Sequence, residues 1–146
     1  MSSNDYVIFV DGSSRGNPGP AGIGIVVFNG KDPSNPIKEI ARPIGYATNN
    51  IAEYEALIYA LKWLLNNQSA TALIKMDSSL VYNQLMGNYR IKSPEMARLV
   101  RRIQILKDKL QSISFELIPR SENKRANRLA QQVTKKISEA AKLRKS

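Results

Sequence analysis

Three runs of β-type apolar residues occupy the first third of this 146-residue chain, before any helical periodicity begins. Short turn-rich segments separate the runs, which predicts an antiparallel meander of three strands. The glycine cluster at 16–20 leads into a second strand, so we interpret it as a hairpin turn and not as a phosphate-binding loop. The predicted strands cover 6–10, 22–28 and 37–44, with a loop at 29–36.

The apolar spacing becomes helical at Asn49, and from there helices and strands alternate. A helix from Asn49 to about Asn66 should be followed by a strand at 72–76 and a short helix at 79–86. A second long helix from Pro94 to Leu110 and a strand at 113–118 come next. We expect a last amphipathic helix that begins near Ser121 and turns these residues toward the core: Ala126, Leu129, Val133, Ile137 and Ala140. The pattern predicts one mixed α/β domain over 1–146, with a core at about 5–135 and a basic helical extension at 136–146.

The chain contains no Cys and no His, which excludes several kinds of chemistry. Disulfides, thiolate or imidazole metal sites and His-assisted nucleophiles are all ruled out. Hydrolysis would have to use carboxylates, hydroxyls, amines or a hard metal ion. The apolar runs are shorter than the ~20 residues of a membrane span, and we expect a soluble, cytoplasmic monomer without a membrane partner.

The net charge of +10 is concentrated in the second half of the chain. Basic residues number 6 against 7 acidic ones over 1–88, but 7 against 2 over 89–109 and 9 against 2 over 120–146. Clustered cations attract a nucleic acid or an anionic membrane surface, although a solvated basic tail would give the same pattern.

Three acidic residues fall where the predicted fold would bring them together. Asp11 follows the first strand, Glu53 lies in the first turn of the long helix, and Asp77 follows the fourth strand. Each also has an ordinary structural explanation, as a turn residue, a helix-dipole partner or a cap. If the two strands are parallel neighbours, the three carboxylates converge and would repel one another unless a cation such as Mg²⁺ or Mn²⁺ bound there.

Four segments together resemble the successive motifs of type 1 ribonuclease H. They are DGSSRGNPGPAG (11–22), TNNIAEYEAL (48–57), DSSLV (77–81) and NKRANRLA (123–130). The resemblance implies a five-stranded mixed sheet flanked by helices and cleavage of the RNA strand of an RNA/DNA hybrid, leaving a 5′-phosphate and a 3′-hydroxyl. It also implies two Mg²⁺ or Mn²⁺ ions, with four residues as metal ligands and catalytic residues: Asp11, Glu53, Asp77 and Asn127.

The same resemblance implies which residues bind the substrate. Asn17, Asn49 and Asn50 occupy positions that contact bases or 2′-hydroxyls in the minor groove, where short amides suit a group that both donates and accepts. Thr48 occupies the position of a DNA-phosphate pocket, and Arg120 is a further substrate-binding candidate. Thr48 and Asn49 could equally serve only as helix caps. Double-stranded RNA is a second candidate partner.

Three departures from the family pattern bear on this interpretation. The basic insertion of many relatives is missing, so binding would depend on other cations: Arg90, Lys92, Arg98, Arg101 and Arg102. The His-bearing loop before the last helix is absent, as in a His-lacking subgroup. Asn127 replaces the fourth carboxylate, and an amide oxygen can ligate a cation but brings no charge. The alternatives are a weakly active or inactive module that binds hybrid or double-stranded RNA, and a junction resolvase or integrase of the same fold.

Overall fold

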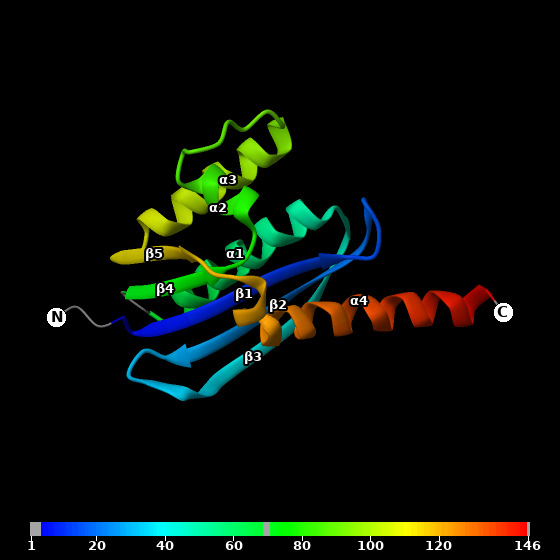
Figure 1. Cartoon of the computed structure of the whole chain (residues 1–146), viewed down its shortest axis with the longest axis horizontal. Coiled ribbons are helices and arrows are strands. Elements are labelled where there is room, and N and C mark those ends of the chain that lie inside the picture. The colour runs from blue at the N-terminus through cyan, green and yellow to red at the C-terminus, as the bar shows by residue number, and fades with distance from the viewer. Residues whose placement is uncertain (1–3, 69–70, 146) are drawn as a thin grey trace.

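A single mixed sheet forms the centre of the molecule in the computed structural model, which describes residues 4–68 and 71–145 (Figure 1). The sheet order is β3-β2-β1-β4-β5, with β1 antiparallel to β2 and parallel to β4. Its strands are β1 (Tyr6–Ser14), β2 (Gly19–Asn29), β3 (Asp32–Ala47), β4 (Thr71–Met76) and β5 (Ser112–Leu117). The predicted meander and the predicted five-stranded mixed sheet are both confirmed.

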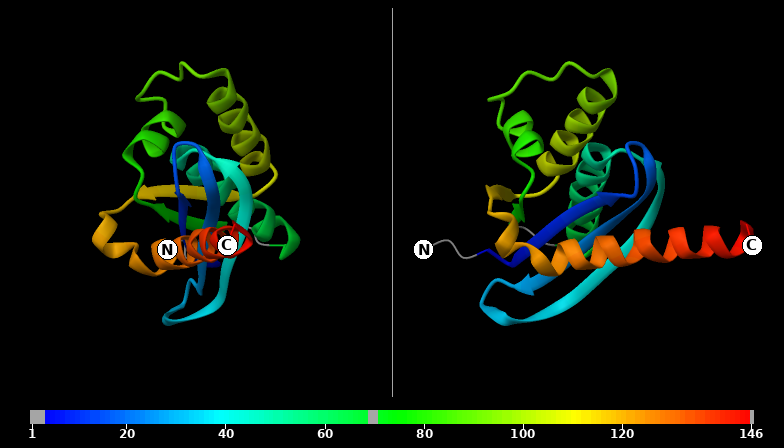
Figure 2. Two further views of the ribbon diagram at one scale, coloured as in Figure 1. Left: turned by 90° about the vertical axis from the view of Figure 1, so that its right-hand side faces the viewer. Right: turned by 45° about the vertical axis from the view of Figure 1, so that its right-hand side comes forward.

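Helices cover both faces of this sheet (Figure 2). One face carries the helices that precede β5, and the other carries the last helix, which packs on β1 and β2. The helices are α1 (Asn49–Asn66), α2 (Ser79–Leu85), α3 (Pro94–Asp108) and α4 (Lys124–Lys145), with a 3₁₀ turn at Arg120–Glu122. The core lies mainly between the sheet and α1, where Tyr54, Leu57 and Leu61 pack on Ile8 and Val10. In the described part of the chain, no helix is long and apolar enough to cross a membrane.

Several strand boundaries differ from the prediction. β2 begins at Gly19, within the glycine cluster predicted as a turn, and β3 ends at Ala47 and not at 44, because Gly19 pairs with Ala47. Residues 32–36, predicted as loop, belong to β3, because the chain turns in two residues after Asn29, whose Oδ1 accepts a hydrogen bond from the amide of Lys31 at 2.8 Å. Prolines at 33 and 36 are tolerated because β3 is an edge strand with bulges in its pairing. The first strand also continues past Val10, since it stays paired with β2 as far as Ser14.

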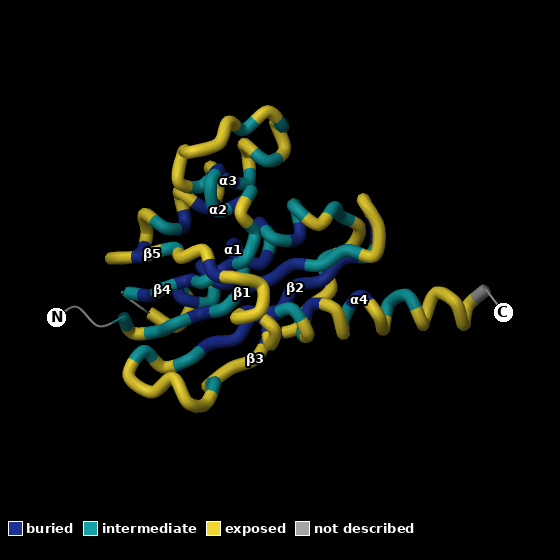
Figure 3. The backbone as a smooth tube through the Cα atoms, in the orientation of Figure 1, coloured by how far each residue is buried: buried dark blue, intermediate teal, exposed yellow. Residues whose placement is uncertain are grey.

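The last helix differs from the prediction at both ends. It begins at Lys124 and not near Ser121, because the 3₁₀ turn comes first. Ala126 and Ala130 are fully buried and Leu129, Val133 and Ile137 are half-buried, but Ala140 is exposed. Figure 3 shows why: the end of α4 extends beyond the sheet and is exposed on most sides. Of the predicted domain, residues 1–3, 69–70 and 146 lie outside the described residues.

Candidate active site

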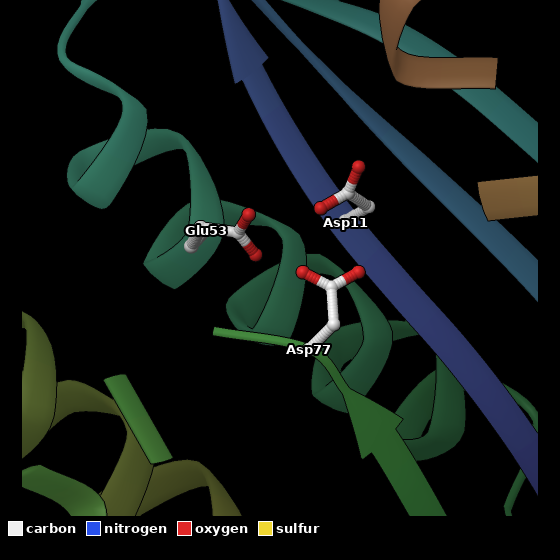
Figure 4. A group of neighbouring side chains, drawn as sticks. All are labelled: Asp11, Glu53 and Asp77. Atoms are coloured by element: carbon white, nitrogen blue, oxygen red, sulfur yellow. The ribbon is translucent and has the colours of Figure 1, made fainter. Parts of the chain in front are cut away.

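Asp11 and Asp77 lie side by side where two parallel strands stop pairing (Figure 4). The β1–β4 register ends with Phe9 opposite Lys75, and two further steps along each strand lead to Asp11 and Asp77. Residues at matching positions of parallel strands point to the same face, so both carboxylates emerge together. The sequence predicts Asp11 at the end of the first strand. The structure places it inside β1, just beyond the residues that pair with β4.

Glu53 reaches the same place from α1. Thr48 caps this helix by accepting a hydrogen bond from the amide of Ile51 at 3.2 Å. Glu53 was predicted in the first turn of this helix, but α1 begins at Asn49 and Glu53 lies just after that turn. A Cβ atom on Gly12 would overlap the backbone of Ala52 and Glu53, so only glycine lets the start of α1 approach β1 so closely. This close approach is what brings the side chain of Glu53 to Asp11.

The three carboxylates form one cluster, as predicted. One oxygen from each of Asp11, Glu53 and Asp77 lies within 4.8 Å of the others (Figure 4). Burial and the neighbouring charges of Asp11 and Asp77 raise the pKa of Glu53 well above its ordinary value. Burial is also the main cause that raises the pKa of Asp11, and the charge of Asp77 adds to it. Without a cation, the site therefore disfavours full ionisation.

Asn127 completes the cluster from the opposite face of the sheet. Gly24 is the register partner of Asp11, and a Cβ atom on Gly24 would overlap the backbone of Ala126 and Ala130. The start of α4 therefore rests directly on this glycine. As a result, the Asn127 amide donates a hydrogen bond from Nδ2 to Oδ2 of Asp11 at 2.6 Å.

Asn123 is a site residue that sequence reasoning did not single out. It is buried just before α4, and its Nδ2 donates to the carbonyl of Val10 at 2.9 Å and to Oδ2 of Asp77 at 2.8 Å. Its Oδ1 is buried without a hydrogen-bond partner among the described residues. The signal was present, because Asn123 opens the last motif, four residues before Asn127. Asn123 joins the middle of β1 and the residue after β4 to the start of α4, and it holds the Asp77 carboxylate.

The cluster opens into a cavity of about 240 Å³. Of the residues predicted to bind substrate, Asn49, Asn50 and Arg120 line this cavity. Ser13 and Ser78, which were not predicted as site residues, line it as well. The full lining is Asp11, Gly12, Ser13, Asn49, Asn50, Glu53, Asp77, Ser78, Arg120 and Asn127. Asn17 and Thr48 lie outside the cavity, the former exposed in the β1–β2 turn. Asn49 also has a structural bond, since its Oδ1 accepts from the amide of Ser14 at 2.8 Å.

Comparison with known proteins gives consistent matches to this chain. A family model described as reverse transcriptase-like matches residues 9–133. The bifunctional protein Rv2228c of Mycobacterium tuberculosis is 43% identical over 124 residues, or 85% of this chain and 34% of that protein. Ribonuclease HI of Halobacterium salinarum is 38% identical over 122 residues, or 84% of this chain and 60% of that protein. The chain thus spans about a third of the length of the mycobacterial relative.

Solved structures match over nearly the whole chain. The N-terminal RNase H domain of Rv2228c superposes with a TM-score of 0.87 and 39% identity, covering 95% of this chain and 99% of that one. LC11-RNase H1 in complex with an RNA/DNA hybrid has a TM-score of 0.83 and 37% identity, covering 90% of this chain and 98% of that one. These likenesses agree with the sheet order and with the helices on both faces.

Proposed function

Because the chain belongs to the ribonuclease H family, we propose that it is an endoribonuclease that hydrolyses the RNA strand of RNA/DNA hybrids. The observation that carries the proposal is the cluster of Asp11, Glu53 and Asp77 at the floor of an open cavity. The expected products are a 5′-phosphate and a 3′-hydroxyl. The hybrid bound to LC11-RNase H1 supports the same kind of substrate here.

The donor atoms of the cluster fit a divalent metal. They are all oxygens, as hard cations such as Mg²⁺ and Mn²⁺ prefer. The pKa values of Asp11 and Glu53 are raised because crowded, buried carboxylates repel one another, and a bound cation would relieve that repulsion. We propose that Asp11, Glu53, Asp77 and the Oδ1 atom of Asn127 hold two such ions. When bound, the ions would supply an activated water and stabilise the leaving oxygen.

The protein groups around the cluster position the reactants. Asp11 is held in place, because it is buried within β1 and accepts a hydrogen bond from Asn127. Asp77 is held in the same way by Asn123. Arg120 lines the cavity beside these carboxylates, where its guanidinium suits a phosphate of the substrate.

We propose that Asn49 and Asn50 contact the minor groove of the hybrid from the rim of the cavity. Asn49 Oδ1 is engaged by Ser14, which leaves its Nδ2 as the group that can donate to a base or a 2′-hydroxyl. Asn17 and Thr48 would act farther along the duplex, since neither lines the cavity. Thr48 performs its capping role in any case.

The catalytic proposal is favoured over a module that only binds. Relatives named ribonuclease HI and RNase H1 match most of the chain, and the cluster keeps three carboxylates. We further propose that the chain forms one cytoplasmic, monomeric domain over 1–146, with a core at about 5–135 and a basic helical extension at 136–146, and that double-stranded RNA is a second ligand. Each of these is a prediction about the protein in solution.

A cleavage assay tests the proposal. End-labelled RNA/DNA hybrid, DNA duplex and RNA duplex are incubated with the protein in Mg²⁺, in Mn²⁺ and in EDTA. We expect the RNA strand of the hybrid to be cut only with metal, and the DNA strand to stay intact. Binding of hybrid without any cleavage in either metal would contradict the enzymatic proposal and favour the binding module.

A further inference from the structure

A row of cations runs along the outer side of α4, starting at the rim of the active-site cavity. Lys124, Arg128, Lys135 and Lys142 recur at helical spacing, and Arg120 precedes them in the 3₁₀ turn. At 100° per residue, the four helix positions fall within about 40° of one another around the axis. All five side chains are exposed. We call these five residues the α4 stripe.

The stripe is continuous with the active site. A shallow hollow beside the cavity is lined by Arg120, Ser121, Lys124, Asn127, Arg128 and Gln131. Arg120 and Asn127 line both this hollow and the carboxylate cavity. A polyanion that enters the active site therefore meets the start of the stripe directly.

The cations of the stripe have no ion-pair partner among the described residues. The ion pairs found there join Lys75 to Glu116 and Arg125 to Glu39. Arg125 lies on a different side of α4 from the stripe, and Glu39 neutralises its charge. Glu139 is the single acidic residue of α4, and it follows Lys135 by one turn. The protein thus offsets only part of the stripe's charge, through Asp11 near Arg120 and Glu139 one turn from Lys135.

The far end of the stripe lies beyond the edge of the sheet (Figure 1). The end of α4 projects beyond the sheet as a straight rod (Figures 1 and 2), and Leu143 is 75% exposed. The helix is 22 residues long, which corresponds to about 33 Å at 1.5 Å per residue. That length matches about ten base-pair steps of a duplex, at 3.4 Å per step.

We propose that the α4 stripe binds the sugar-phosphate backbone of the hybrid duplex beyond the scissile phosphate; this rests on the proposed function. The stripe carries no aromatic side chain, whereas proteins that grip single strands use aromatic stacking. The exposed end of α4 also lacks the large apolar face of a membrane-surface helix. A row of cations without either feature suits the phosphates of a duplex.

The stripe should act on binding and not on the chemical step. Its distal cations contact the substrate equally in the ground state and in the transition state, so they lower KM without changing kcat. They should act only on hybrids long enough to reach them. The stripe should therefore make hydrolysis depend on the length of the hybrid and on the salt concentration.

The test compares Lys135→Gln/Lys142→Gln with wild type on hybrids of about 8 and about 24 base pairs, lengths below and above the reach of the stripe. On the long hybrid we expect KM to rise several-fold, kcat to stay the same, and the slope of log(kcat/KM) against log salt to fall by about 2. On the short hybrid the variant should match wild type. Glu139→Gln should lower KM on the long hybrid only.

Lys31→Gln/Lys38→Gln is the matched control. It removes the same charge from exposed positions near the β2–β3 turn, away from the projecting end of α4 (Figure 1). Its KM and kcat should equal those of wild type on both hybrids. Equal effects of the stripe variant on both hybrid lengths, or none on either, would overturn the proposal. So would an unchanged affinity for the long hybrid together with lost binding to phosphatidylserine vesicles.

Two arms keep the stripe separate from the catalytic proposal. If wild type cleaves neither hybrid, the catalytic proposal fails. Fluorescence anisotropy in EDTA then still tests the stripe, because it measures the affinity of wild type and of the stripe variant for the long hybrid. We expect the variant to bind more weakly, and the slope of log affinity against log salt to fall by about 2. If cleavage is normal and the stripe variant equals wild type, only the stripe proposal fails.

Discussion

Asn127 donates a hydrogen bond from its amide nitrogen to Oδ2 of Asp11 at 2.6 Å. The bond joins α4 to β1 at the point where Gly24 lets the helix touch the sheet. An aspartate at this position would place a second negative charge against an already crowded carboxylate. The amide thus stabilises the metal-free cluster, and its Oδ1 stays available as a neutral ligand.

Replacing Asn127 with Asp should trade stability for metal affinity. Without divalent metal we expect Asn127→Asp to lose about 1–3 kcal/mol of unfolding free energy, through a lost hydrogen bond and a new like-charge contact. With metal, it should reach half-maximal cleavage at a lower Mg²⁺ concentration and have a higher rate than wild type, which should favour Mn²⁺. Thermal melts with and without Mg²⁺, together with metal titrations of activity, measure both effects.

Asn127→Ala is the control, because it removes the bond without adding charge. It should lower stability and leave metal affinity no better than wild type. Identical metal midpoints and rates for Asn127→Asp and wild type would show that position 127 does not serve the metals.

Asp11→Asn should reduce hydrolysis of the hybrid by roughly 10² or more, and Asp77→Asn should do the same. Each change removes one of three negative charges that hold the cation. Neither should unfold the protein, because an amide relieves the repulsion within the cluster. Single-turnover cleavage with circular dichroism as a folding check measures this, and cleavage by Asp11→Asn at the wild-type rate would refute the metal assignment.

Glu53→Gln should stabilise the metal-free protein at neutral pH while abolishing activity. The raised pKa of Glu53 means that the folded state binds its proton more tightly than the unfolded state, whose value is near 4.5. The wild type therefore has this favourable contribution in full below about pH 4.5 and loses it as the pH rises through the folded pKa. We expect Glu53→Gln to raise the free energy of unfolding by on the order of 1 kcal/mol at pH 7 and to change it little at pH 4.

Urea unfolding in EDTA at both pH values measures the effect of Glu53→Gln. The conservative Glu55→Gln, two positions along α1 and outside the cluster, is the control and should lack the gain in unfolding free energy at pH 7. A stability difference that is the same at both pH values would contradict the explanation.

Asn123→Ala should destabilise the protein and loosen Asp77. It deletes two hydrogen bonds of a buried amide and leaves the carbonyl of Val10 unpaired, which costs about 1–3 kcal/mol. Because Asp77 loses a positioning partner, the metal requirement should rise as well. Urea unfolding and Mg²⁺ titration measure the two effects, and lost stability with an unchanged metal midpoint would leave Asn123 a purely structural residue.

Arg101→Ala/Arg102→Ala tests the cations of α3. Both side chains are exposed, and the sequence predicts that they replace the missing basic insertion. If they contact phosphates, the slope of log affinity against log salt should fall by about 2. An unchanged slope would mean that α3 faces away from the duplex.

Much of the fold could be predicted because the periodicity is strong and local. Asn49, Ser78 and Pro94 lie at or beside helix starts, and the helices begin there because short polar side chains and proline suit the first turn. The ends of strands were less predictable. Residues 32–36 join β3 only through pairing with β2, and Asp11 lies within β1 only because the hairpin stays paired to Ser14. Pairing between two strands leaves no sign in the periodicity of either segment alone.

The carboxylate cluster was predictable because parallel strands end together, so Asp11 and Asp77 could be placed from topology alone. Asn123 was not, because its role depends on a buried bond to a residue 46 positions away. The glycines at 12 and 24 likewise gave no local sign that a helix would rest on each of them.

The cluster draws its four side chains from β1, α1, the end of β4 and α4, and the last of them is at position 127. A chain emerging from the ribosome therefore carries an incomplete site until α4 has left the exit tunnel and settled on Gly24. Unfinished protein would pass nascent transcripts and hybrids without cutting them, and nuclease activity would begin only with the completed fold.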